Sequence, residues 1–484
     1  MTRGITILGL GPGDPQLLTR QAQTVIDGLQ EIYLRTERHP TVEALPKNIE
    51  VHSFDHLYDQ AEKFEDVYAQ IIDQVLALGE RPEGVTYAVP GSPFVAEATC
   101  PEIYRRAKEN GLPVRVVEGL SFFEPVCTAL GIDPYPRLIM ADAMELAILH
   151  HVNFPPTFPA LIAQVYSRQI AAELKMTLLS VYPDEHPVKL VHSAGNSDEV
   201  VESIGLYEID RSEHIGLLTV LYIPPLEPDA SFEAFQEVVA HLRAPEGGCP
   251  WDREQTHVSL RKALLEETYE ALKAIDEENP QKLAEELGDL LLQIVLHAQI
   301  GSEEGDFSMV DVLEGINRKI VRRHPHVFGD FKLEGMDHLL TNWEKLKAAE
   351  RKENGNVEKS LLDGVPDILP ALTQSQEVQD RAARVGFDWK DIRGVLDKII
   401  EEINEIDAAR DPQELNDEMG DLLFAVVNYA RWRKVDPEFA LRDTTQKFRK
   451  RFAYIEKKAR LSGREVSQLS FDEQNEAWEE AKKI

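Results

Sequence analysis

The 484-residue sequence is poor in cysteine, in basic residues and in long apolar runs. Its three cysteines, Cys100, Cys127 and Cys249, are odd in number and widely spaced, which fits neither a disulfide framework nor a zinc site. No apolar stretch approaches the ~20 residues that a membrane span needs, and the run Ile5–Leu10 is too short for a signal peptide. We therefore expect a cytoplasmic protein with no membrane partner.

Basic residues are outnumbered, because 52 Lys and Arg stand against 85 Asp and Glu, a formal net charge of −33. Binding a nucleic acid polymer requires cations that neutralise phosphates, so this charge argues against such a partner. An anionic small ligand would need a bound metal, or a local group of Lys and Arg, to reverse the field. The overall apolar and charged fractions, 43% and 28%, are ordinary for a folded protein.

The composition changes near residue 226. Of the 28 prolines, 19 precede it, while charged residues rise from 47 in the first 225 positions to 90 in the remaining 259. Short β-rich runs alternate with helical stretches at 66–79 and 97–110, which predicts an α/β domain over residues 1–225. These runs are Ile5–Leu10, Val85–Val89, Val114–Val117, Val188–His192 and Leu217–Ile223. The proline cluster in Ile223–Ala230 predicts a linker.

After the linker, apolar residues follow a helical period. Leu260, Leu264 and Ala271 recur at spacings of one and two turns, and a second break at Leu361–Pro370 divides the helical region into two halves. We predict an α/β domain followed by all-α structure, with a first domain at 1–225, a first helical repeat at 226–358 and a second helical repeat at 359–484.

The two helical repeats carry the same acidic motifs. The sequence LEETYE at Leu265–Glu270 corresponds to IEEINE at Ile400–Glu405, at an offset of 135 residues. The sequence ELGD at Glu286–Asp289 corresponds to EMGD at Glu418–Asp421, at an offset of 132 residues. Such agreement indicates an internal repeat, in which each half carries the same chemistry.

Carboxylates of these motifs border the predicted cores. On helices that turn ~100° per residue, Glu267 and Glu402 flank the apolar stripe, and Glu270 and Glu405 follow one turn later on the same side. Ionised carboxylates beside a core cost several kcal/mol unless they are paired or bound to metal. A solvated acidic face explains the pair at 277–278, but a repeated group of four carboxylates favours a hard dication, and Mg²⁺ is the usual choice with phosphate substrates.

Cations and aromatic residues follow each acidic region. Lys319 and Arg323 are one turn apart, and Lys347 follows Trp343 by one turn, an arrangement that suits a triphosphate and a base. Exposed cations that merely balance nearby acids, and a tryptophan that belongs to the core, are the alternative. The second repeat has the same four residue types at Lys447, Arg451, Trp478 and Lys482.

The motif Glu-Glu-x-x-Glu followed by Glu-x-x-Asp resembles the signature of the all-α nucleoside triphosphate pyrophosphohydrolases. Further segments are similar specifically to the MazG family: Pro245–Asp252 with Gln255–His257, Arg322–Gly329 and Gly386–Trp389. The resemblance covers residues 226–484 as tandem all-α MazG helical bundles. It implies Mg²⁺-dependent hydrolysis of nucleoside triphosphates to the monophosphate and pyrophosphate, in a homo-oligomer such as a dimer.

The resemblance also assigns roles by position. The implied metal ligands are Glu267, Glu270, Glu286 and Asp289, then Glu402, Glu405, Glu418 and Asp421. Glu266 and Glu401 are implied as further metal-site or water-orienting acids beside the catalytic glutamates. The implied substrate contacts are Lys319, Arg323, Trp343 and Lys347, then Lys447, Arg451, Trp478 and Lys482. One difference stands out, because Thr445 in the second repeat replaces Asn317, which favours a weaker second site and leaves open whether both sites turn over.

In the first domain, Ile5–Asp14 reads as a strand that runs into a glycine loop. The pattern G-x-G-x-G, with Pro12 inside it and Pro15 after it, matches a dinucleotide fingerprint poorly and by itself predicts a tight turn. Two more glycine loops, at Val89–Val95 and Val117–Phe122, follow predicted strands. Three such loops at the carboxyl ends of strands would line one ligand crevice.

In order and spacing these loops resemble the tetrapyrrole methylase family of S-adenosylmethionine-dependent enzymes. The resemblance covers nearly all of residues 1–225 and implies two α/β subdomains with the cofactor between them. By position, S-adenosylmethionine would contact Pro12, Ser92, Val95, Ser121 and Phe122. The family's usual Gly-Asp-Pro is Gly-Ser-Pro at 91–93 here, so a methyltransferase with an unidentified acceptor and a ligand-sensing domain that no longer methylates both stay open.

The leading hypothesis is a cytoplasmic, Mg²⁺-dependent nucleoside triphosphate pyrophosphohydrolase with an attached methylase-like domain. One alternative is a non-catalytic helical scaffold whose acidic groups bind metal or a partner. Another makes methylation the main activity and the helical region an accessory.

Overall fold

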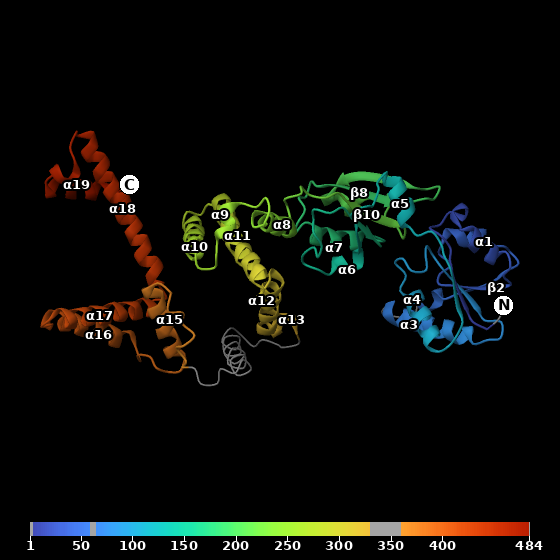
Figure 1. Cartoon of the computed structure of the whole chain (residues 1–484), viewed down its shortest axis with the longest axis horizontal. Coiled ribbons are helices and arrows are strands. Elements are labelled where there is room, and N and C mark those ends of the chain that lie inside the picture. Colours follow the sequence, from blue (N-terminus) through green and yellow to red (C-terminus); the bar gives the residue numbers. More distant parts are fainter. Residues whose placement is uncertain (1–2, 59–63, 330–359, 484) are drawn as a thin grey trace. The chain divides into compact units, whose positions relative to one another are not determined.

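The computed structural model describes residues 3–58, 64–329 and 360–483. The chain divides into two compact units, Met1–Glu314 and Gly315–Ile484. The first unit begins with two five-stranded sheets, and helices make up the described chain beyond them (Figure 1). This arrangement confirms the predicted fold class, an α/β domain of two subdomains followed by all-α structure.

The first sheet is parallel and has the strand order β3-β2-β4-β1-β5. Ile5 of β1 lies between Val85 of β4 and Val114 of β5, so the carboxyl ends of these three strands share one edge. The strands are β1 (Ile5–Gly9), β2 (Glu31–Leu34), β3 (Glu50–Ser53), β4 (Val85–Val89) and β5 (Val114–Val117). The helices are η1 (Pro15–Leu17), α1 (Arg20–Ile26), η2 (Pro40–Ala44), α2 (Asp55–Tyr58), α3 (Phe64–Gly79), α4 (Thr99–Glu109) and α5 (Phe123–Leu130).

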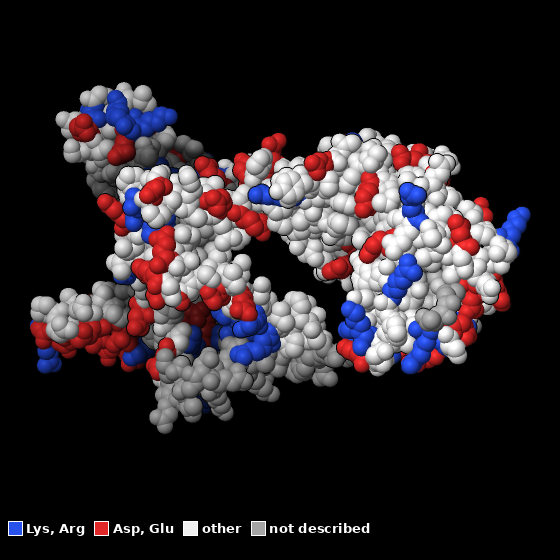
Figure 2. All heavy atoms as spheres, turned by 45° about the vertical axis from the view of Figure 1, so that its right-hand side comes forward, with Lys and Arg blue, Asp and Glu red and all other residues white. Residues whose placement is uncertain are grey.

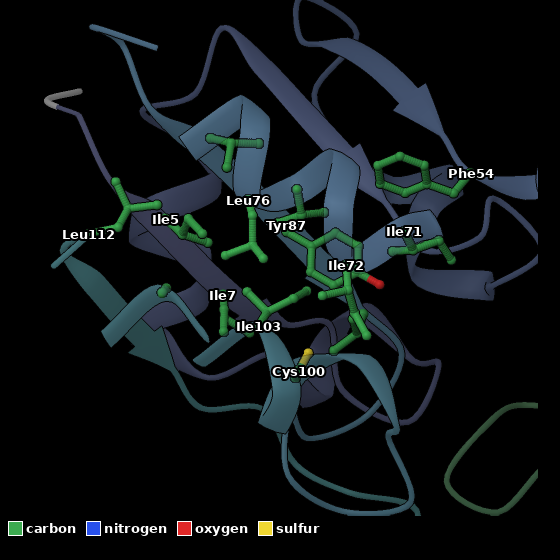
Figure 3. Close-up of a cluster of buried hydrophobic side chains, with 14 of the residues drawn as sticks. Ile5, Ile7, Phe54, Ile71, Ile72, Leu76, Tyr87, Cys100, Ile103 and Leu112 are labelled. Atoms are coloured by element: carbon green, nitrogen blue, oxygen red, sulfur yellow. The ribbon is translucent and has the colours of Figure 1, made fainter. Parts of the chain in front are cut away.

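Helices cover both faces of this sheet, and alternate strand residues therefore enter two separate cores. Ile5, Ile7 and Tyr87 are buried against α3 and α4, as Figure 3 shows. Leu8 and Leu10 point to the other face and pack with α1. Burial of each such side chain stabilises the fold by roughly 1.5–3 kcal/mol, which holds the carboxyl edge of the sheet in place.

The second sheet has the order β6-β7-β10-β8-β9. Only β6 and β7 pair in parallel, while the other neighbours are antiparallel. The strands are β6 (Ile139–Asp142), β7 (Ala160–Ala163), β8 (Pro187–His192), β9 (Val200–Gly205) and β10 (Thr219–Ile223). The helices are α6 (Ala143–Ala147), α7 (Arg168–Leu178) and η3 (Leu206–Arg211).

The described chain after the linker is helical in both repeats. In the first repeat they are α8 (Phe232–Leu242), α9 (Pro250–Glu254), α10 (Arg261–Asp276), α11 (Pro280–Glu304), α12 (Met309–Arg323) and α13 (Pro325–Phe328). In the second repeat they are α15 (Ala371–Arg384), α16 (Ile392–Ala408), α17 (Pro412–Trp432), α18 (Pro437–Leu461), η4 (Val466–Gln468) and α19 (Phe471–Ala481). The closest pairs are α10 with α11 and α16 with α17, the helices that carry the acidic motifs.

The apolar stripes of the acidic helices are only partly buried. Leu260 and Val395 are each 1% exposed, but Leu287 and Leu291 are 49% and 38% exposed, and Ile403 is 46% exposed. A helical hairpin covers one side of each helix, and the remaining apolar side chains have no full cover among the described residues. We therefore find an uncovered apolar surface beside each acidic motif.

Acidic side chains are spread over the face seen in Figure 2 and are not gathered in one patch. Among residues 3–58, 64–329 and 360–483, no helix combines the length and apolar character that crossing a bilayer requires.

Candidate functional site

The first acidic group lies on the α10–α11 hairpin. Asn279 ends the connection and caps α11, because its side-chain oxygen accepts a hydrogen bond from the backbone N–H of Lys282 at 3.1 Å. The tight connection sets the register of the two helices. Glu267 and Glu270, one turn apart on α10, thereby face Glu286 of α11.

Glu267, Glu270 and Glu286 form what we call the first carboxylate group. Each offers one oxygen, and these oxygens lie within 4.8 Å of one another. Glu286 is 6% exposed. Burial raises the pKa of Glu267, and the negative charge of Asp289 raises this pKa further. Burial and the neighbouring Glu270 likewise raise the pKa of Glu286, so the group is strained by like charges unless a cation joins it.

The second carboxylate group, on the α16–α17 hairpin, consists of Glu402, Glu405 and Glu418. Their oxygens also lie within 4.8 Å of one another. Asp411 sets the register here by accepting hydrogen bonds from the first backbone N–H groups of α17. Glu402 is 1% exposed, and burial together with Glu405 and Glu402 raises the pKa of Glu418. Asp421, like Asp289 in the first repeat, lies outside the group, so its metal role stays a prediction.

The two repeats differ in the carboxylates that a lysine of the acidic helix contacts. The Nζ atom of Lys398 lies 2.6 Å from Oε1 of Glu402 and 2.9 Å from Oε1 of Glu401. Hydrogen bonds to these carboxylates raise the pKa of Lys398. In the first repeat, Lys262 instead contacts Glu266 at 3.1 Å, on the solvent side of α10. Sequence analysis did not single out Lys398, although a comparison of the two repeats position by position would have shown the shifted lysine.

The donor set of both groups fits a hard divalent cation. Each glutamate of the two groups offers a carboxylate oxygen, and hard cations such as Mg²⁺ prefer oxygen. In the second group, Oε2 of Glu402 is buried and has no hydrogen-bond partner among the described residues. Buried acceptors of this kind are rare in folded proteins, and a bound cation would satisfy this one.

The predicted phosphate contacts are described only in part. Lys319 and Arg323 lie one turn apart on α12, and Lys447 lies on the exposed surface of α18. Trp343 and Lys347 fall outside the described residues. For all five, contact with a nucleotide stays a prediction.

In the second repeat, α18 and α19 bring a predicted cation to a predicted aromatic platform. The guanidinium carbon of Arg451 lies 5.5 Å from the ring centre of Trp478, and the ring of Phe448 lies 5.2 Å from the same ring. Lys482, at the end of α19, forms an ion pair with Glu479 at 2.5 Å. Arg451 and Trp478 are therefore in contact, although they come from different helices.

The three glycine loops of the first domain meet at the carboxyl edge of the first sheet. The backbone N–H of Gly91 donates to the carbonyl of Gly11 at 2.8 Å, and the N–H of Gly11 donates back at 3.2 Å. A Cβ atom on Gly119 would lie 2.4 Å from the carbonyl oxygen of Gly91. At Gly119 the backbones pack so closely that no side chain fits, while at Gly11 and Gly91 the backbone angle φ is positive, at 74° and 70°, which favours glycine.

The predicted cofactor residues lie on these loops. They are Pro12, Ser92, Val95, Ser121 and Phe122. Pro12, Ser92 and Ser121 are buried, while Val95 and Phe122 are half-buried. The hydroxyl of Ser121 donates to the carboxylate of Glu124 at 2.6 Å and thus stabilises the start of α5.

Sequence analysis missed two residues that shape this edge. The buried Thr41 hydroxyl lies 3.1 Å from the carbonyl of Leu10 and 2.8 Å from that of Gly13, so it holds the first glycine loop. A Cβ on Gly13 would lie 2.4 Å from Oδ1 of Asn196, a residue in the β8–β9 loop. The second subdomain therefore closes onto the glycine loop of the first. An isolated Thr and an isolated Asn carry no pattern that would have revealed this.

Two family descriptions match the sequence. The MazG nucleotide pyrophosphohydrolase domain matches residues 255–328 and 392–454, which contain both carboxylate groups. The tetrapyrrole (corrin/porphyrin) methylases match residues 4–210, which contain the three glycine loops.

Individual proteins are similar to all or to part of the chain. The chain is 41% identical, over 100% of its length and 99% of the relative's, to the uncharacterized protein YabN of Bacillus subtilis. Over 52% of its length it is 46% identical to the nucleoside triphosphate pyrophosphohydrolase/pyrophosphatase MazG of Thermotoga maritima, of which it covers 95%. Among solved structures, the uroporphyrin-III C-methyltransferase of Thermus thermophilus covers 46% of this chain and 94% of its own, at 23% identity and a TM-score of 0.36.

Proposed function

The chain belongs to the MazG family, in a form that also carries a tetrapyrrole methylase domain, and from this premise we propose that its helical region hydrolyses nucleoside triphosphates to monophosphates and pyrophosphate with Mg²⁺. Relatives named for nucleoside triphosphate pyrophosphohydrolysis, from Thermotoga maritima and Escherichia coli, are 46% and 43% identical over about half of this chain. The observation that carries the proposal is the repeated carboxylate group, in which a buried glutamate meets two others.

In this proposal each carboxylate group holds a metal ion. Asp289 is a further ligand in the first group, and Asp421 is a further ligand in the second. The ion, when bound, polarises phosphate oxygens and lowers the pKa of the attacking water. The buried Glu286 and Glu402 give each site a fixed ligand, because packing against the neighbouring helix restricts their rotamers. Glu266 and Glu401 immediately precede Glu267 and Glu402 and serve as further metal-site or water-orienting acids.

The cations and aromatic residues position the triphosphate in this proposal. Their role is needed because the chain carries a net charge of −33, which repels a polyanion unless local cations compensate. Lys319, Arg323 and Lys347, and in the second repeat Lys447, Arg451 and Lys482, neutralise phosphate oxygens. Trp343 and Trp478 stack on the base, and Arg451, 5.5 Å from the centre of the Trp478 ring, brings a cation next to the second of these residues.

A turnover assay on acidic variants tests the proposal. We expect Glu270→Ala and Glu405→Ala each to remove pyrophosphate release by its own repeat, and the double variant to remove it entirely, in a panel of NTPs and dNTPs with MgCl₂. Glu277→Ala is the matched control, because this side chain is 47% exposed and only pairs with Lys282 at 3.6 Å. Release that persists in the double variant would refute the metal assignment. A wild-type protein that cleaves no NTP or dNTP would favour the scaffold alternative.

For the first domain we propose S-adenosylmethionine as the ligand of the crevice formed by the three glycine loops. The close packing of Gly11, Gly91 and Gly119, and the approach of Asn196 to the first loop, support a narrow cleft between two subdomains. Calorimetry on the full chain tests this, and the double acidic variant should bind as the wild type does. Binding with methyl transfer would identify a methyltransferase, binding without it a ligand sensor, and no binding would exclude both.

We further propose the domain boundaries 1–225, 226–358 and 359–484, a cytoplasmic location and a homo-oligomer. The exposed Leu287, Leu291 and Ile403 support self-association, because they leave apolar surface beside each acidic motif. Sedimentation equilibrium measures the assembly, and a monomer at all concentrations would contradict it.

A further inference from the structure

The two carboxylate groups have the same ligand types but different direct cation contacts. In the second group, Lys398 touches Glu402 at 2.6 Å, and Glu402 is a proposed metal ligand. In the first group, the nearby Lys282 influences Glu286 only electrostatically, while its Nζ pairs with Glu277 at 3.6 Å. Only in the second group, among the described residues, does a lysine form an ion pair with one of the three carboxylates that the metal would use.

The difference comes from a one-residue shift along the helix. At the offset of 135 that aligns Glu267 with Glu402, Lys398 aligns with Ala263, and Lys262 aligns with Asp397. One residue turns a helix by ~100°, which moves the ammonium group from the solvent side to the side of the metal ligands. Lys262 accordingly remains 85% exposed, whereas Lys398 is 36% exposed.

Building on the proposed function, we infer that Lys398 competes with the divalent ion for Glu402 and thereby makes the second repeat the weaker metal site. The ion can use Oε1 of Glu402 only after the ammonium group of Lys398 has left it. If the ion pair is formed about nine-tenths of the time, the apparent metal affinity of the second site falls about tenfold. The unpartnered Oε2 of Glu402 stays available, so the site is weakened and not destroyed.

The consequence is a protein with two unequal sites. At a low concentration of divalent ion only the first repeat would bind the ion. The second repeat would bind it at a concentration about tenfold higher. The same acidic motif would therefore operate in two ranges of metal concentration.

Binding of Mn²⁺ alone to the full chain, measured by electron paramagnetic resonance of the free ion without nucleotide, tests this inference. Glu270→Gln silences the first site and reports the second, and Glu405→Gln does the reverse. In the Glu270→Gln background we expect Lys398→Met to tighten Mn²⁺ binding about tenfold. Lys262→Met, in the Glu405→Gln background, is the matched control and should change nothing.

A variant of the first repeat tests the same inference by adding a lysine, so that the result does not depend on whether Lys398→Met folds correctly. Ala263→Lys places a lysine in the first repeat where Lys398 lies in the second, and we expect it to weaken Mn²⁺ binding at the first site about tenfold. Equal affinities at the two sites, or no tightening by Lys398→Met in a variant with wild-type circular dichroism, would overturn the inference. Mn²⁺ binding that survives both Glu270→Gln and Glu405→Gln would instead overturn the proposed metal sites themselves.

Discussion

Replacing Glu267 by Gln should stabilise the metal-free protein while it disables the first site. The carboxylate oxygens of Glu267 and Glu270 lie within 4.8 Å, where two unit charges at an effective dielectric constant of 20 repel by about 3 kcal/mol. Solvent around the exposed Glu270 and added salt reduce this to about 1 kcal/mol. Gln keeps the shape of the side chain and removes the charge, so we expect the midpoint of thermal unfolding to rise by roughly 2–4 °C.

The same substitution should lower the activity of the first repeat, although it raises stability. The amide no longer offers a charged oxygen to the metal, so pyrophosphate release by the first repeat should fall at least about hundredfold, or about 2.7 kcal/mol. Turnover is measured in the Glu405→Gln background, where the second repeat is silent, and stability by scanning calorimetry in EDTA at low ionic strength.

The matched control for this experiment is Glu278→Gln, an exposed acid in the turn between α10 and α11. It should change neither the unfolding midpoint nor turnover. A metal-free Glu267→Gln protein that is less stable than its parent, or that still releases pyrophosphate at the parent's rate, would refute the account of the carboxylate group as a charge-strained metal site.

Two further predictions concern pH and a buried ion pair. The raised pKa values of Glu286 and Glu418 mean that the folded state holds protons which the unfolded state releases above pH 4.5. In EDTA the contribution of these groups to the free energy of unfolding is therefore fully present at and below pH 4.5 and is lost as pH rises through their folded pKa. Mg²⁺ should oppose this dependence, because it binds the deprotonated carboxylates and so stabilises the protein more as pH rises. Thermal midpoints across pH 4.5–7 with and without Mg²⁺ measure the difference, and identical profiles would count against the prediction. Arg243→Met should destabilise the start of the first repeat by about 3 kcal/mol, because Arg243 is buried, donates to Glu303 at 2.7 Å and also donates to two backbone carbonyls. Hydrogen exchange over residues 249–260 should rise in this variant and stay unchanged in the exposed control Arg253→Met, and equal exchange in both would show that the ion pair does not anchor this loop.

Part of the fold was predictable because it depends on local patterns. The runs at β1, β4, β5, β8 and β10 are strongly apolar and bounded by Pro and Gly, and each was predicted within two residues of its observed limits. The five other strands were not singled out, although with four to six residues each they are as long as the predicted ones. Their pairing depends on neighbours that lie far away in the sequence.

The sequence by itself determined that two helical repeats each carry glutamates at the margin of an apolar stripe. A helix repeats every 3.6 residues, so the side on which Glu267, Glu270 or Glu402 lies follows from the spacing alone. The order of the three glycine loops was equally readable, since each follows a strand of a parallel sheet.

Only the tertiary structure decided which of these residues meet. The depth of Glu402 in its hairpin, the ion pair with Lys398 and the approach of Asn196 to Gly13 depend on how closely two elements pack. The exposed Leu287 is a further example. An apolar pattern predicts which side of a helix is buried, but it does not predict which element packs against that side. Contacts between elements depend on the distance and the crossing angle at which the elements pack. The periodicity of residues along one element gives no information about either.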